Sequence, residues 1–153
     1  MVLVFFIAAT LANALIFRSR GSKQAQGRPE LEAGYRSIAI GYATWGNLPR
    51  VVMGIGCVFG GVPSVFHYFR PRDGNPFVLA FFASVFLVWI LGSNWIVFKG
   101  GAEALVKHPG LLNYELKSPR MVILLWFFSL AAGIVAAIVM FSTDLPLPTH
   151  RTP

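Results

Sequence analysis

Charged and reactive side chains are scarce in this chain of 153 residues. Charged residues make up 12% of it, whereas a typical soluble domain carries about 25%. The single cysteine, Cys57, excludes an internal disulfide and a thiolate metal site, and we expect it to be a buried, inert thiol. The chain has no Ser-His-Asp spacing, no His-Glu-x-x-His pattern and no glycine-rich phosphate loop. These absences favour a protein that is not an enzyme.

Apolar residues take the place of charge, at 56% of the chain, and the mean hydropathy is +0.64. They gather in four stretches, whose predicted spans are about 2–17, 50–69, 76–98 and 120–141. A bilayer core of about 30 Å takes about 20 helical residues to cross. We therefore expect an all-α integral membrane protein, with four transmembrane helices forming one small bundle and a single domain over 1–153. Basic residues follow the first stretch instead of preceding it, which favours an uncleaved anchor over a signal peptide.

The segment between the first two stretches is polar over 18–36, and we expect a loop there. Four large residues then recur at helical spacing: Tyr35, Ile38, Tyr42 and Trp45. This stripe predicts a short helix lying in the membrane interface before the second span. In the alternative, this segment enters the membrane and Arg50 lies near the bilayer centre. Placing a charged side chain there costs at least about 2.5 kcal/mol of free energy. We therefore expect Arg50 at the headgroups.

Turn signals separate the remaining elements. Asn47 is a predicted N-cap, and Pro49 is tolerated in the first turn that follows it. The Gly-Gly-Val-Pro run at 60–63 predicts a kink or local unwinding of the second span. Strong breakers at 70–75 make the second and third spans antiparallel neighbours. A partly helical loop is expected around Ala102–Lys107, before the fourth span.

Basic residues are distributed unevenly, which predicts orientation by the positive-inside rule. Ten of the 13 lysines and arginines fall on the side of the first loop: Arg18, Arg20, Lys23, Arg28, Arg36, Arg50, Lys99, Lys107, Lys117 and Arg120. The other three are Arg70, Arg72 and Arg151. We therefore expect both termini on the non-cytoplasmic side, in a bacterial inner membrane, with a disordered tail at 142–153. Because the basic residues flank apolar stretches, we expect them to contact lipid headgroups, and we expect no nucleic-acid partner.

Small residues form two stepped faces on the predicted helices. Gly56 and Gly60 make a Gly-x-x-x-Gly step, and Ser129, Gly133 and Ala137 recur every four residues. Such faces let helices approach closely, either within this bundle or against a partner or second copy. The unwinding at 60–63 is interpreted as a packing kink, with exposure of backbone carbonyls to an ion as the alternative.

Two sets of residues are weak candidates for chemistry. His67 and Met140 share a predicted depth, so they could ligate a haem iron, and a lone histidine could bind a chlorophyll magnesium. The competing interpretation of His67 is an interfacial side chain bonded to water, lipid or backbone. Glu103, Lys107 and His108 cluster in sequence, but no nucleophile or metal motif accompanies them, which favours a solvated turn. No cofactor is identified from the sequence.

The leading hypothesis for function is an accessory, structural or assembly subunit of a larger membrane protein complex. Its partners are then the lipid bilayer and other membrane subunits, or further copies of itself. One alternative is a cofactor-binding subunit of an electron-transfer or light-harvesting complex, and another is an oligomeric small-solute channel or lipid-handling protein. No Asp, Glu or Lys falls inside a predicted span, which argues against a pump or an ion-coupled transporter.

Overall fold

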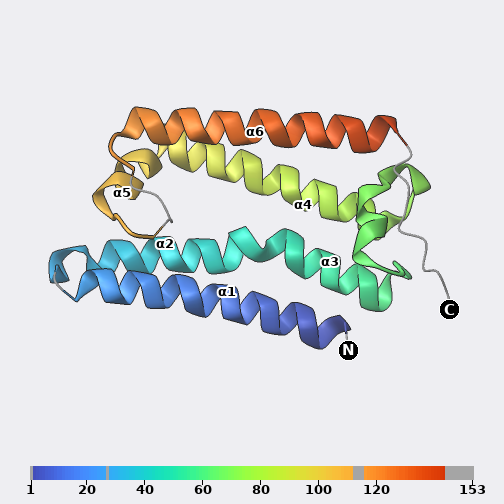
Figure 1. The fold of residues 1–153 in the computed structure, drawn as a ribbon, viewed down its shortest axis with the longest axis horizontal. Helices are drawn as coiled ribbons and strands as arrows, with labels where there is room; N and C mark the ends of the chain where they lie inside the picture. The colour runs from blue at the N-terminus through green and yellow to red at the C-terminus, as the bar shows by residue number, and fades with distance from the viewer. Residues whose placement is uncertain (1, 27, 112–115, 144–153) are drawn as a thin grey trace, which may run out of the picture.

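Four long helical rods lying side by side make up most of the molecule (Figure 1). The computed structural model describes residues 2–26, 28–111 and 116–143, of which 85% are helical, with no strand among them. The rods are α1 (Val2–Ala25), α2 (Glu32–Thr44) continued by α3 (Leu48–Phe59), α4 (Pro76–Ser93) and α6 (Pro119–Ser142). The all-helical bundle expected from the sequence is confirmed. The tail predicted to be disordered falls outside the described residues from position 144 onward.

Short helical pieces join the rods. They are η1 (Pro29–Leu31), η2 (Trp45–Asn47), η3 (Val65–Phe69), η4 (Pro71–Asp73), η5 (Asn94–Phe98) and α5 (Gly101–Lys107). The η5 segment is a π-helical turn that prolongs α4, so this rod reaches Phe98 as predicted. The predicted helix around Ala102–Lys107 is confirmed as α5.

The first rod is longer than its apolar stretch, so the loop expected over 18–36 is wrong. α1 continues to Ala25, and helix resumes with η1 at Pro29. The polar part of α1 is rich in straight-chain residues, which favour helix as much as the apolar ones do. Gly21, its weakest helix former, is buried where α2 passes: a Cβ there would sit 3.5 Å from the Cβ of Tyr35.

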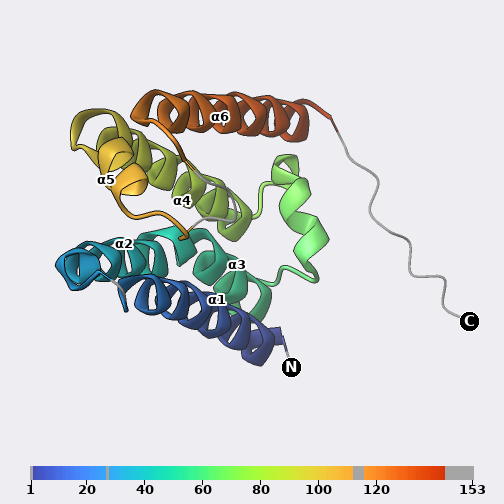
Figure 2. The same ribbon diagram turned by 60° about the vertical axis from the view of Figure 1, so that its left-hand side comes forward.

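The second rod is continuous, which differs from the separate interfacial helix expected before it. α2 is helical as predicted, but it lies antiparallel to α1 and runs through η2 into α3 (Figures 1 and 2). Tyr42 stacks on Phe17 of α1 at a ring-centroid distance of 4.2 Å, and Tyr35 is 2% exposed. The aromatic stripe therefore contacts protein along much of its length, and only Trp45 at its end is largely exposed.

The second rod ends where the glycine-proline run begins, which confirms the predicted unwinding. α3 stops at Phe59, and Gly61 adopts a left-handed φ of 63°. Asn75 then joins two helix ends. Its Nδ2 donates to the Gly60 carbonyl (3.1 Å), and its Oδ1 accepts from the Phe77 N–H (2.9 Å) in the first turn of α4. The 70–75 turn makes α3 and α4 antiparallel neighbours, as predicted.

The contact between α3 and α4 is close because two glycines face it. A Cβ on Gly56 would overlap the Tyr68 hydroxyl and lie 2.9 Å from Phe77 Cβ, and one on Gly60 would overlap the Phe77 ring. Tyr68 is 1% exposed, and its hydroxyl donates to the Met53 carbonyl (2.9 Å). The smooth face of α3 is thus occupied by side chains of the same chain.

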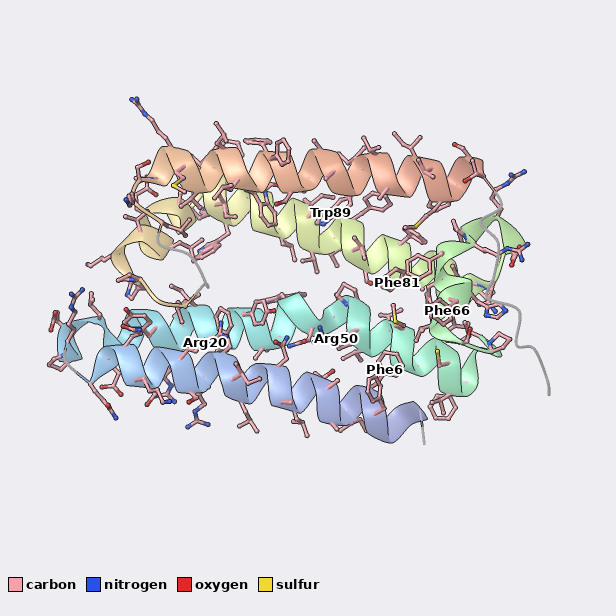
Figure 3. All side chains as sticks on the ribbon, in the orientation of Figure 1. Phe6, Arg20, Arg50, Phe66, Phe81 and Trp89 are labelled. Atoms are coloured by element: carbon pink, nitrogen blue, oxygen red, sulfur yellow. The ribbon has the colours of Figure 1, made fainter. Side chains whose placement is uncertain are left out.

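Apolar side chains cover much of the outside of the bundle (Figure 3). The helices Pro76–Phe98 and Pro119–Ser142 are long and apolar enough to cross a membrane. Only 17% and 11% of their most apolar windows are buried, whereas the core helix of a soluble protein buries most of its apolar face. Large apolar side chains that are more than half exposed occur on all four rods, among them Phe5, Leu15, Phe59, Ile90, Leu124 and Phe128.

We predict that Gly56→Ala destabilises the bundle by about 1–3 kcal/mol, because the new methyl group overpacks the contact with Tyr68 and Phe77. The matched control is Gly41→Ala in α2, where a Cβ meets nothing within 4 Å. That change should stabilise the helix by about 0.5–1 kcal/mol. Thermal unfolding in detergent, followed by circular dichroism, measures both. Equal effects of the two substitutions would contradict the close approach of α3 and α4.

Candidate functional site

A small polar cluster lies between α1 and the second rod, at the level of η2. Its members are Asn13, Tyr42, Asn47 and Arg50. Asn47 is 1% exposed and Arg50 is half-buried. Figure 3 shows Arg50 near the middle of the long axis, level with Trp89 of α4. Asn13 is midway along α1, so two rods contribute polar groups at the same level.

Asn47 holds the second rod together at the point where its helix is interrupted. Pro49 has no N–H to donate, so the regular helical hydrogen-bond pattern cannot continue through it. The Asn47 side chain turns back instead, and its Nδ2 donates to the carbonyls of Ala43 (3.0 Å) and Tyr42 (3.4 Å). The prediction that Asn47 is an N-cap is therefore wrong for its side chain, which caps no N–H of α3. Its backbone is helical, whereas a capping residue is usually extended.

The oxygen of Asn47 joins the two rods. Oδ1 accepts from Arg50 Nη1 at 2.6 Å and from Asn13 Nδ2 at 3.3 Å. Asn13 Nδ2 also lies 3.3 Å from the Tyr42 hydroxyl oxygen. One buried amide thus bonds the backbone of α2, the side chain of α1 and the first turn of α3.

The cluster has many donors and few acceptors. A guanidinium carries five N–H donors and stays protonated at any physiological pH, yet the partner that the described residues give Arg50 is one amide oxygen. The ion pair found among those residues is Arg70–Asp73, at 3.2 Å in η4. The site can therefore attract an anion, but it offers neither a nucleophile nor a group that would exchange a proton near neutral pH.

A second polar contact closes the end of the bundle near α5. The Tyr35 hydroxyl donates to the Pro109 carbonyl (2.8 Å), and burial raises the pKa of Tyr35 against the opposing effect of Arg28. His108 Nδ1 is 2.6 Å from the Ala104 carbonyl, so this nitrogen carries the proton that it donates. The His108 ring fills the space that a Cβ on Gly34 would need.

Glu103, Lys107 and His108 are close in sequence, but their side chains do not point the same way. His108 is 7% exposed and turned toward α2, whereas Glu103 and Lys107 are exposed. The three side chains therefore form no shared site, and the contact of His108 is structural.

The two candidate haem ligands have different surroundings. His67 lies in η3, half-buried, with Nδ1 3.0 Å from the Ser64 hydroxyl oxygen. Met140 packs against the apolar cluster that contains Tyr68 and Ala137. Within the described part of the chain, no three His, Cys, Asp or Glu side chains gather as a metal site would require.

The small-residue face of α6 contacts its own chain at two of its three positions. A Cβ on Gly133 would meet the Trp89 ring, and Ala137 is buried against residues that include Phe82. Ser129 is exposed at the edge of a small apolar pocket of about 90 Å³ beside Trp126. The Trp126 indole N–H donates to the Ser93 hydroxyl (2.9 Å), which links α6 to α4.

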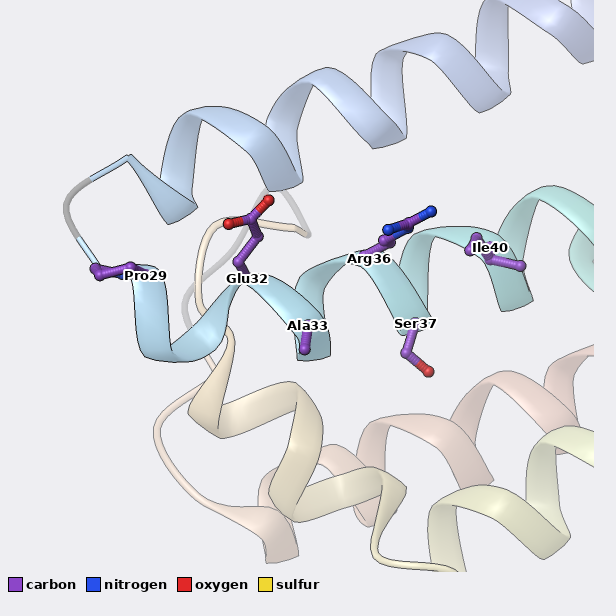
Figure 4. A pocket seen from close by; sticks show the side chains of 6 residues that line it. All are labelled: Pro29, Glu32, Ala33, Arg36, Ser37 and Ile40. Carbon is purple, nitrogen blue, oxygen red and sulfur yellow. The ribbon is translucent and has the colours of Figure 1, made fainter.

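A hollow of about 560 Å³ lies along α2. Its lining residues are Pro29, Glu32, Ala33, Arg36, Ser37 and Ile40 (Figure 4). Figure 4 shows Glu32 and Arg36 on one side of α2, and Ala33 and Ser37 on the other. Because all six residues belong to one short stretch of chain, no second element contributes a converging group, and the hollow has no binding chemistry of its own.

Sequence reasoning identified the residues of the polar cluster but not their association. Asn47 was assigned to a cap and Arg50 to the headgroups, and Asn13 is a polar residue within the first apolar stretch. The signal that was available is the i, i+3 spacing of Asn47 and Arg50, which places both on one helix face if the helix continues through η2. No family model, curated protein or solved structure matches this chain in comparisons of sequence and fold.

Removal of the Asn47 amide should destabilise the bundle more than removal of the nearby Thr44 hydroxyl. We predict that Asn47→Ala lowers the free energy of unfolding by about 1–3 kcal/mol, because buried partners lose their hydrogen bonds. Thr44→Ala is the control, since Thr44 is exposed and bonds only carbonyls of its own helix, and it should cost under about 0.5 kcal/mol. Adding Asn13→Ala to Asn47→Ala should cost less than the sum of the single changes in thermal unfolding, because the two residues share a bond. Full additivity would contradict the link between α1 and η2.

Proposed function

We propose that this chain is a non-catalytic, four-span subunit of a larger membrane protein complex, with an accessory or assembly role. The observation that carries the proposal is the distribution of side chains. Large apolar groups point outward from all four rods, while Asn13 of the first apolar stretch and Arg50 at the start of the second meet at Asn47, between α1 and the second rod. A bilayer satisfies an outward apolar surface, and polar groups within it then bond to one another.

The basic residues support a common orientation of the rods. Arg18, Arg20 and Lys23 lie in the polar end of α1, at the same end of the molecule as α5 and the start of α6. Arg70 and Arg72 lie in η4 at the opposite end. A bilayer between these ends keeps most of the positive charge on one side, as the positive-inside rule requires for a cytoplasmic surface. The end of α1 near Lys23 and the start of α2 then lie at the edge of the hydrocarbon on that side.

An accessory role fits what the described site offers. Its groups are amides, one phenol and one guanidinium, none of which is a ready acid, base or nucleophile near neutral pH. The small-residue faces of α3 and α6 are largely filled from within the chain. Recognition of a partner is therefore expected to rely on the outer apolar surface and on charge.

Membrane insertion is tested by cysteine accessibility in a Cys57→Ala background. Ser22 and Ser142 are exposed and lie toward opposite ends of the molecule. In intact cells we expect an impermeant maleimide to label Ser142→Cys and to leave Ser22→Cys unlabelled until the membrane is opened. Labelling of both sites in intact cells, or release of the protein by alkaline carbonate, would overturn the four-span arrangement.

The accessory role is tested by gentle purification of tagged protein from its native membrane. We expect one larger membrane protein to elute in fixed ratio with it, and we expect no visible absorption band from a pigment. Quantitative mass spectrometry and an absorption spectrum of the same fraction measure both. A colourless homo-oligomer would contradict the accessory role, and a Soret band lost in His67→Ala would instead establish the cofactor alternative.

A further inference from the structure

We propose that Arg50 binds a carboxylate from an apolar helix of a different membrane protein, at mid-depth in the bilayer. The inference rests on the proposed membrane embedding and specifies the chemistry of the partner. It is carried by the charge of Arg50, by its place in the rod and by the donor excess of the cluster around it.

The charge of Arg50 is paired with no opposite charge among the described residues. Arg50 bonds the Asn47 oxygen at 2.6 Å, and that same oxygen also accepts from Asn13. A neutral amide oxygen already shared by two donors compensates a half-buried cation poorly. Charged groups at membrane depth are usually paired with an opposite charge, because hydrocarbon supplies none. A carboxylate matches the guanidinium fork with two parallel hydrogen bonds.

Arg50 lies near the middle of the bundle's long axis (Figure 3). Arg50 is level with Trp89, which lies in the middle of the candidate span Pro76–Phe98 (Figure 3). The hydrocarbon core is about 30 Å thick, so lipid phosphates lie about 15 Å from its centre. A lipid phosphate reaches that depth only by distorting the bilayer, whereas an acidic side chain on a crossing helix is already there. The depth of Arg50 therefore favours a helix over a lipid.

The neighbours of Arg50 define its direction on α3. Gly54, four residues after Arg50, faces Phe6 of α1, and Met53 packs against the cluster that contains Tyr68 and the start of α4. Arg50 therefore lies between the residues of α3 that face α1 and those that face α4, and its side chain is half-buried. The proposed carboxylate would approach the guanidinium between α1 and α4.

A second copy of this chain does not supply the carboxylate. The sequence has six acidic residues, Glu30, Glu32, Asp73, Glu103, Glu115 and Asp144, and all of them lie outside the four apolar stretches. A second copy in the same membrane has no carboxylate to offer at the depth of Arg50. The partner is therefore a different protein, with an Asp or Glu near the middle of an apolar helix.

The test uses defined peptides and the full chain in phosphatidylcholine vesicles. The probe is a Leu/Ala helix of about 20 residues with lysine flanks and one Glu at its centre, a position that keeps its depth in either orientation. The matched peptide has Gln at that place. Energy transfer from the peptide to a dye on Ser142→Cys, in the Cys57→Ala background, reports binding. We expect the Glu peptide to bind about tenfold more tightly or better, as close charge pairs do elsewhere.

The variant Arg50→Gln should abolish this preference while leaving Gln peptide binding unchanged. Arg120→Gln, an exposed arginine at the start of α6, is the control and should keep the preference. Insertion of each variant into the vesicles is measured in the same samples by protease protection, so loss of embedding is distinguished from loss of pairing.

Two results would overturn the proposal. Equal affinity of the wild-type chain for the Glu and Gln peptides would do so without reference to any variant. A Glu preference that survives in Arg50→Gln would assign the carboxylate to another residue. If the peptides bind equally, and purified wild-type protein carries phosphatidylglycerol from its native membrane that purified Arg50→Gln lacks, the site belongs to a lipid phosphate and not to a helix.

Discussion

The arrangement of the four rods depends on the close approach of α3 to α4. Gly56 and Gly60 leave room for Phe77 and Tyr68, and any larger side chain at either position would overlap these rings or the Tyr68 hydroxyl. The Tyr68 hydroxyl is then held by the Met53 carbonyl one turn away. This contact joins the α1/α2–α3 pair to the α4/α6 pair, and the bond from Tyr35 to Pro109 joins the two pairs again at the other end.

Large apolar side chains lie on the outside of the bundle as well as in its interior. The described core consists of three small apolar clusters, while many of the largest apolar side chains are outside. The polar cluster around Asn47 lies among these rods, so hydrogen bonds contribute to the specificity of their packing. Burial of apolar area drives such association weakly when the surroundings are themselves apolar.

The sequence allowed the apolar segments, the unwinding at 60–63, the turn at 70–75 and α5 to be predicted, because each depends on local composition. It did not allow the ends of α1 and α2 to be predicted, since Arg18–Ala25 forms helix despite its polarity. The candidate site was missed for a related reason. Gly46, Asn47 and Pro49 are usual helix breakers, yet the Asn47 side chain bonds the carbonyls that a break leaves open. The location of Arg50 between α1 and the second rod depends on helix continuing through η2, which the sequence did not indicate.

Asn75 has a consequence for how the chain enters its folded state. Its amide nitrogen bonds the last turn of α3 and its amide oxygen bonds the first turn of α4. The cap of α4 is local to that helix, whereas the Gly60 carbonyl at the end of α3 gains its bond only when the start of α4 is in place. We therefore expect the end of α3 to become ordered together with α4, and to lose its order when α4 is lost.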